Sequence, residues 1–225
     1  MTFSLVARCK DSGMFGIAIS SSSPAVAARC SWAEAGTGAV ASQNITDPSL
    51  GPAVLQLMRN GAGAAESLAE ITSTTNFIDY RQLLVVDKDG NTQIHSGDKA
   101  LGTVAEHAIT NAASAGNLLD NTTIPKTMVD TFHATSGHLG DRLITALQAG
   151  LTAGGEAGPV HSAGLLLVDN VSWPVAELRC DWSPDACPIK NIATAWEVYK
   201  PQLADYTQRA LDPTLAPSYG VPGDE

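Results

Sequence analysis

A hydroxyl side chain stands directly behind the first methionine, because the chain starts MTFSLVAR with Thr2 after Met1. Methionine aminopeptidase removes a Met that precedes a small residue, so Thr2 could become the N-terminal residue with a free α-amine. Such an amine has an ordinary pKa of about 7.7 to 8.0 and could take the hydroxyl proton directly or through one water. We therefore interpret Thr2 as a nucleophile that carries its own base. A retained Met1 would block this chemistry.

The run SSSSP could bring further hydroxyl groups to Thr2. Ser20 and Ser21 end an alternating segment that starts at Phe15, and residues 10–13 between the two segments predict a hairpin turn. In a hairpin the end of the second strand returns beside the start of the first. We expect Ser20 and Ser21 to lie beside Thr2 and to orient water or substrate.

A second polar run ends the next predicted strand, residues 37–42, where the sequence reads Ser42, Gln43 and Asn44. Acyl transfer needs donors for the developing oxyanion, and losing one typically costs about a hundred- to thousandfold in rate. If this strand ends near the hairpin, its backbone N–H groups or the Asn44 amide could fill that role. We therefore predict the oxyanion donors at Ser42 to Asn44.

The elements that must position these residues follow from periodicity. Hairpin-linked strands open the chain, helices gather in the middle, and strands return near the end, an α+β order that suits two antiparallel sheets covered by helices on both outer faces. The predicted strands are residues 2–7, 15–19, 37–42, 82–86, 92–95, 162–168 and 175–180. The predicted helices are residues 48–60, 63–73, 125–134, 138–153 and 189–211.

Composition narrows the classes of partner. The 225 residues suit one domain, and a net charge of −10 would repel nucleic acid and anionic membranes. There is no signal-like start and no apolar run of about 20 residues, and the four cysteines lack CxxC spacing, so we expect a cytoplasmic protein with free thiols. His133 and His138 have no third partner at metal-ligand spacing. We expect no metal and no cofactor, and a small-molecule substrate.

The end of the chain differs in composition from the rest. Residues 213–225 are rich in Pro and Gly and contain Leu215 and Tyr219. We predict one domain over residues 1–212 and an extended C-terminal arm over residues 213–225. The arm could tuck onto a neighbouring copy, which favours a homo-oligomer, a dimer or higher.

Several stretches resemble a known family. They are MTFSLVAR, GIAISSSSPAVAARCSWAEAGTGAVASQN, AGNLL, GLTAGGEAGPVHSAGLLLVD and the ending APSYGVPGDE. Nearly end to end, the chain is similar to domain-of-unknown-function family 1028, whose members resemble N-terminal-nucleophile (Ntn) hydrolases. The resemblance implies the four-layer αββα sandwich and places Thr2 at the nucleophile position.

The resemblance does not extend to the charged partners of the nucleophile. Proteasome-like Ntn hydrolases carry an Asp at the end of the second strand and a Lys on the third, where this chain has Ser20 or Ser21 and small residues near residues 35–39. Arg29 could replace the missing charge, and Asn117, in the motif shared with the family, could point into the cleft. His161, at the start of a predicted strand, is a candidate for a pocket wall.

The sequence thus predicts an Ntn-type amidohydrolase that cleaves a small non-peptide C–N bond, such as an amide, a lactam or a ureido group, with Thr2 as nucleophile. The alternative is a non-catalytic small-molecule-binding or scaffold protein that retains the fold. The missing Asp and Lys favour that alternative, and replacement of Thr2 by Ala discriminates the two.

Overall fold

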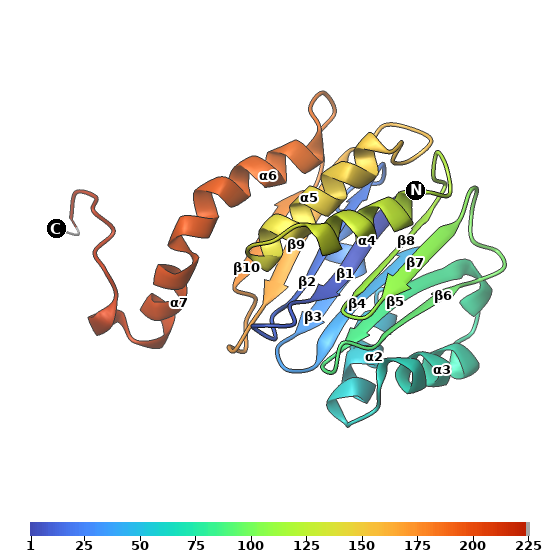
Figure 1. Cartoon of the computed structure of the whole chain (residues 1–225), viewed down its shortest axis with the longest axis horizontal. Coiled ribbons are helices and arrows are strands. Elements are labelled where there is room, and N and C mark those ends of the chain that lie inside the picture. Colours follow the sequence, from blue (N-terminus) through green and yellow to red (C-terminus); the bar gives the residue numbers. More distant parts are fainter. Residues whose placement is uncertain (224–225) are drawn as a thin grey trace.

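Two antiparallel sheets lie face to face in the computed structural model, which describes residues 1–223 (Figure 1). The first sheet has the spatial order β10 (Ala176–Cys180), β9 (Ser162–Val168), β2 (Phe15–Ser21), β1 (Thr2–Arg8), β8 (Ala112–Asn117), β7 (Ala105–Ile109). The second has the order β3 (Ser31–Glu34), β4 (Gly38–Asn44), β5 (Arg81–Asp87), β6 (Thr92–Ser96). The strand that starts at Thr2 is therefore central in the larger sheet.

Helices cover the outer face of each sheet (Figure 1). On the larger sheet lie α4 (Ile124–Ala134), α5 (Leu139–Thr152) and α6 (Pro188–Tyr199). On the smaller sheet lie α2 (Leu50–Arg59) and α3 (Ala64–Thr74), and the short α1 (Val26–Cys30) follows β2. The expected four-layer αββα sandwich is confirmed.

Strand alternation in β1 divides the core into layers. Phe3 and Leu5 pack under α4 and α5, whereas Val6 faces the second sheet and joins the apolar layer between the sheets. A third layer joins the smaller sheet to α2 and α3. Thr2 and Ser4 have the same parity as Val6, so both side chains point into the space between the sheets.

The sequence predicts no strand between residues 96 and 124, and this is wrong. This region holds β7 and β8, and β8 pairs directly with β1. The segment 112–117, AASAGN, contains no β-branched or aromatic residue, so local propensity does not reveal a strand that is completely buried in the structure.

The predicted last helix, residues 189–211, is also interrupted. The structure has α6, a 3₁₀ turn (Lys200–Gln202) that contains Pro201, and then α7 (Leu203–Leu211). Proline removes a backbone donor and clashes with the preceding turn, which explains the break. No residue of α7 is buried, and Figure 1 shows α7 and the following segment projecting away from the sandwich.

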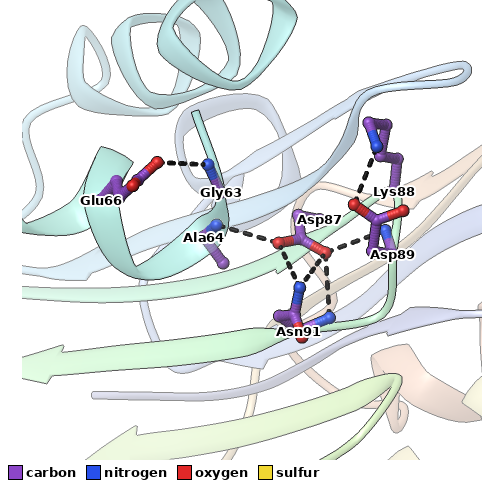
Figure 2. Close-up of polar contacts among 7 residues, drawn as sticks. All are labelled: Gly63, Ala64, Glu66, Asp87, Lys88, Asp89 and Asn91. Atoms are coloured by element: carbon purple, nitrogen blue, oxygen red, sulfur yellow. Dashed lines mark hydrogen bonds and ion pairs between the residues drawn. The ribbon is translucent and has the colours of Figure 1, made fainter. Parts of the chain in front are cut away.

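A buried carboxylate, Asp87, ties the end of β5 to neighbouring backbone groups (Figure 2). Asp87 ends β5 and accepts hydrogen bonds from the backbone N–H of Ala64, Asp89 and Asn91, and from the Asn91 side chain. The β5–β6 turn is thereby tied to the first residue of α3. Among the described residues, no helix is long and apolar enough to cross a membrane.

Candidate active site

The N-terminal residues are held at the end of β1 by the two neighbouring strands. Thr2 pairs with Asn117 of β8, and Phe3 pairs with Ser20 of β2, so Ser21 comes next to Thr2. The Thr2 hydroxyl lies 3.4 Å from the Ser21 hydroxyl, and the Thr2 residue is 5% exposed. The hairpin has therefore placed Ser21 where the sequence predicted it.

The carbonyl oxygen of Met1 is the centre of the hydrogen bonds at this end. It accepts from the hydroxyls of both Thr2 and Ser21. The backbone N–H of Ser23 donates to Ser21 Oγ at 3.0 Å. Ser21 accepts from the Ser23 N–H and donates its own proton to the Met1 carbonyl. Ser21 thus acts as a polarised donor to a carbonyl beside Thr2.

Ser20 lies on the other face of the sheet. It pairs with Phe3, which points to the helices, and its hydroxyl donates to the backbone oxygen of Ser162 at 3.0 Å. Adjacent residues of a strand point to opposite faces. The structure therefore brings Ser21, and not Ser20, to the Thr2 hydroxyl.

A buried polar network lies beside Thr2 between the two sheets. The hydroxyl of Ser4 donates to Gln43 Oε1 at 2.7 Å, and Gln43 Nε2 donates to Gln82 Oε1 at 2.8 Å. Asn117 Nδ2 donates to the same Gln82 oxygen at 3.1 Å. Asn117 Oδ1 is buried and has no hydrogen-bond partner, so it remains an available acceptor next to Thr2 in the strand register.

The other two members of the 42–44 run bond elsewhere. Ser42 donates to the backbone oxygen of Asp47, and Asn44 bonds to Tyr80 and Leu101. Ser42 has the parity of Val40, which packs under α2 and α3. Of this run, only Gln43 reaches the β1 side of the network.

Glu156 is a site residue that the sequence interpretation missed. It lies in the loop between α5 and β9, is 5% exposed, and both carboxylate oxygens accept from the Ser22 N–H at 3.0–3.1 Å. Burial raises its pKa to about 7, against the lowering effect of the Met1 ammonium and of the Ser22 bonds. A lone carboxylate in the glycine-rich run GGEAG was the available signal.

The remaining candidates, His161 and Arg29, bond to neighbouring backbone groups. His161 donates its backbone N–H to the Ser21 oxygen at 2.9 Å, and its ring stacks on Trp182 with centroids 4.5 Å apart. Arg29 donates to the Pro24 oxygen at 3.0 Å. The structure shows no contact between Arg29 and Thr2 among the described atoms. His161 is thus one backbone bond from the site.

No group of three or more His, Cys, Asp or Glu residues that could hold a metal ion occurs among residues 1–223. The groups beside Thr2 are hydroxyls and amides, and one carboxylate of raised pKa, Glu156, accepts from Ser22, the residue after Ser21. These can donate to a carbonyl, accept from an amine and exchange a proton near neutral pH, the requirements of acyl transfer.

The chain is similar to a protein family and to a solved structure with the same fold. The profile of the family of unknown function DUF1028 matches residues 2–192. The crystal structure of protein SPO2555 from Silicibacter pomeroyi, of the same family, is 26% identical, with a TM-score of 0.85 over 92% of this chain and 94% of that one. No curated protein sequence matches the chain.

Two Anbu structures are more distant. Anbu (ancestral beta-subunit) from Yersinia bercovieri is 9% identical with a TM-score of 0.38, over 92% of this chain and 97% of that one. An Anbu (Gly-1) mutant from Hyphomicrobium sp. strain MC1 is 13% identical with a TM-score of 0.38, over 92% of this chain and 100% of that one. Scores this low have no bearing on the reaction.

Proposed function

Given that the chain belongs to the family of unknown function DUF1028, we propose that it is an Ntn-type amidohydrolase that uses Thr2 as nucleophile once Met1 has been removed. One observation carries the proposal. A carbonyl oxygen beside the Thr2 hydroxyl accepts a hydrogen bond from Ser21, whose own lone pair is occupied by the Ser23 N–H. A substrate carbonyl at this position would meet a nucleophile and a donor together.

The Thr2 hydroxyl, the Thr2 amine and Ser21 can carry out every step of the proposed reaction, with water as the second reactant. Thr2 Oγ1 attacks the carbonyl carbon of the substrate amide, and its proton passes to the free Thr2 amine, directly or through one water. Ser21 Oγ holds the oxyanion. The C–N bond then breaks as the Thr2 ammonium returns the proton to the leaving nitrogen, which leaves an ester on Thr2. Water, deprotonated by the same amine, hydrolyses the ester and releases the acid.

Asn117 and Gln43 position the reacting groups and do not contact the substrate carbonyl. The unpartnered Asn117 Oδ1 is an acceptor for the freed Thr2 amine, because the two residues are paired in the strand register. The bonds through Gln82 fix the Asn117 side chain. These are positioning roles, since neither side chain would touch the reacting carbonyl.

The substrate is a small molecule with a non-peptide C–N bond, such as an amide, a lactam or a ureido group. Thr2 is 5% exposed, and the loop that carries Glu156 is bonded to Ser22, the residue after Ser21. A site this enclosed would accommodate a small acyl group more readily than an extended polypeptide. His161 and Trp182 would bound the leaving group.

The proposal is tested first at the N-terminus. Mass spectrometry of the protein purified from its own host should find Met1 absent. Thr2→Ala should then reduce hydrolysis of a responsive amide by at least about a thousandfold, whereas Thr2→Ser, which keeps the hydroxyl, should retain measurable turnover. Full retention of Met1, or equal rates for Thr2→Ala and the unaltered protein, would contradict the mechanism and favour a non-catalytic binding protein.

We also propose that the chain assembles with a second copy through its C-terminal end, as a dimer or a higher oligomer, with residues 1–212 as the domain and 213–225 as the arm. An isolated nine-residue helix is marginal in water, and α7 buries no residue on its own sandwich. Leu211 and Leu215 are 61% and 73% exposed. A second copy would cover them. The four free thiols favour assembly in the cytoplasm.

The assembly is tested by light scattering. Leu211→Asp with Leu215→Asp should lower the molar mass to that of one chain, and Lys88→Asp, which changes an exposed side chain in the β5–β6 turn, is the matched control. A monomeric unaltered chain would contradict the proposal.

A further inference from the structure

Glu156 is buried without the partner that such a carboxylate ordinarily has. Charged groups are almost never fully buried unless they are paired. Among residues 1–223 no ion pair includes Glu156, and its hydrogen bonds come from the uncharged Ser22. The positive charge that acts on it most strongly is the α-ammonium of Met1. The group that balances Glu156 is thus the residue that the proposed mechanism removes.

Met1 contacts its surroundings through its carbonyl oxygen and its side chain, and it lies beside the loop that carries Glu156. Its carbonyl oxygen accepts from Ser21 and Thr2. Its side chain lies along Gly158, where an added Cβ would come within 3.3 Å of the Met1 Cε. The loop of Gly158 also carries Glu156 two residues earlier, and the positive charge of the Met1 ammonium acts to lower the pKa of that carboxyl group. Removal of Met1 would therefore leave three groups without their partner. They are the Ser21 hydroxyl, which can donate to a carbonyl, the space beside Gly158, which can hold a side chain, and the Glu156 carboxylate, which would lose the Met1 ammonium.

We propose that these three features bind the acyl half of the substrate, and that this acyl half carries a free α-ammonium group held by Glu156. The substrate class is then the α-amino acid amide, with an unbranched apolar side chain lying against Gly158. The inference rests on the proposed function of Thr2. The proposed function requires only that the substrate has an amide bond. This inference specifies its acyl half, which Glu156 and Gly158 would recognise.

The residue Met1 is itself the template for this class. It is an α-aminoacyl group with an unbranched thioether side chain, joined to the nitrogen of Thr2. A substrate acyl group would occupy the same place joined to the Thr2 oxygen. The Met1 carbonyl oxygen accepts from Ser21, and the positive charge of the Met1 ammonium acts on Glu156. A substrate acyl group in the same place would present its carbonyl and its α-ammonium to the same two residues.

The test compares two amides with the same skeleton, L-methioninamide and 4-(methylthio)butanamide, which lacks the α-amine. The Met1-free protein should hydrolyse the amino amide with a kcat/KM at least about tenfold higher, the range of a charge-assisted hydrogen bond. Glu156→Gln should bring the ratio of the two values close to one. Asp120→Asn is the matched control, because this exposed carboxylate on the nearby loop loses the same charge and should leave the ratio unchanged.

A binding experiment tests this inference separately from the proposed reaction. L-Methioninamide should raise the melting temperature of the Met1-free Thr2→Ala protein, 4-(methylthio)butanamide should raise it less, and Glu156→Gln should abolish the difference. If neither amide is hydrolysed but this pattern holds, the nucleophile is wrong and the recognition stands. Equal hydrolysis or equal stabilisation by the two amides would overturn the inference and assign Glu156 to the Thr2 amine instead.

Discussion

Asp87 and Glu156 are both buried carboxylates, 3% and 5% exposed, yet their pKa values shift in opposite directions. Burial acts to raise the pKa of each. At Asp87 the hydrogen bonds from Ala64, Asn91 and Asp89 outweigh burial, and the pKa falls below its ordinary value (Figure 2). At Glu156 the bonds from Ser22 do not outweigh it, and the pKa is about 7. The depth of burial and the number of donors together decide which carboxylate is poised to exchange a proton.

The two carboxylates also mark two ends of the same sandwich. Asp87 pairs with Gly38 at the start of β4, whereas Gln43, near the end of β4, reaches Ser4 beside Thr2. At the Asp87 end the donors of a turn and of a helix start are satisfied. At the Thr2 end Asn117 Oδ1 has no partner. One end is built for stability, and the other retains unused hydrogen-bonding capacity.

The largest expected effect is a loss of stability at the Asp87 end of the sandwich. Asp87→Ala leaves the N–H groups of Ala64, Asp89 and Asn91 without their acceptor, and each buried orphan donor costs about 1 to 3 kcal/mol. We expect the free energy of unfolding to fall by about 4 kcal/mol in urea titrations. Asp89→Ala, which removes an exposed carboxylate from the same turn, should cost much less. Equal losses for the two would contradict the comparison.

At the Thr2 end the expected loss is in rate. Ser21→Ala removes the donor to the carbonyl and should lower kcat by about a hundred- to thousandfold, while the loss of the acceptor for the Ser23 N–H should lower the free energy of unfolding by about 1 kcal/mol. Ser20→Ala is the matched control, because it removes the same hydroxyl from the adjacent residue on the opposite face of β2. Steady-state rates on the responsive amide measure both. A control that loses as much rate as Ser21→Ala would refute the assignment.

The pH dependence of stability should separate the two carboxylates. The folded pKa of Glu156, about 7, exceeds its ordinary 4.5, so its contribution is complete below pH 4.5 and is lost as pH rises to about 7, by up to about 3 kcal/mol. His161 and the Met1 ammonium oppose this loss. For Asp87, whose folded pKa is lowered, stability is present above its ordinary 3.8 and is lost as pH falls below it.

Urea titrations between pH 3 and pH 8 measure both limbs. Glu156→Gln should flatten the decline between pH 4.5 and 7 and leave the acid limb, while Asp87→Asn should weaken the acid limb and leave the decline. A Glu156→Gln protein that keeps the neutral-pH decline would show that another group causes it.

Much of the site around Thr2 was predictable because it depends on local chain geometry. The alternation of Phe3 and Leu5 and the tight turn at residues 10–13 bring the end of β2 back to Thr2. The same alternation decides between Ser20 and Ser21, since neighbours on a strand face opposite sides. Sequence reasoning assigned both serines to the site because it did not fix the parity of β2 against Thr2.

The sequence alone determined the layer order, the hairpin that starts at Thr2 and the hydroxyl groups available there, because these follow from the periodicity of adjacent residues. The tertiary structure decided which distant groups face Thr2. Asn117 arrives on a strand of small residues that lacks a propensity signal, and Glu156 arrives on a loop far along the chain. Burial then sets the pKa of Glu156, and burial is a property of the assembled fold that no local pattern encodes.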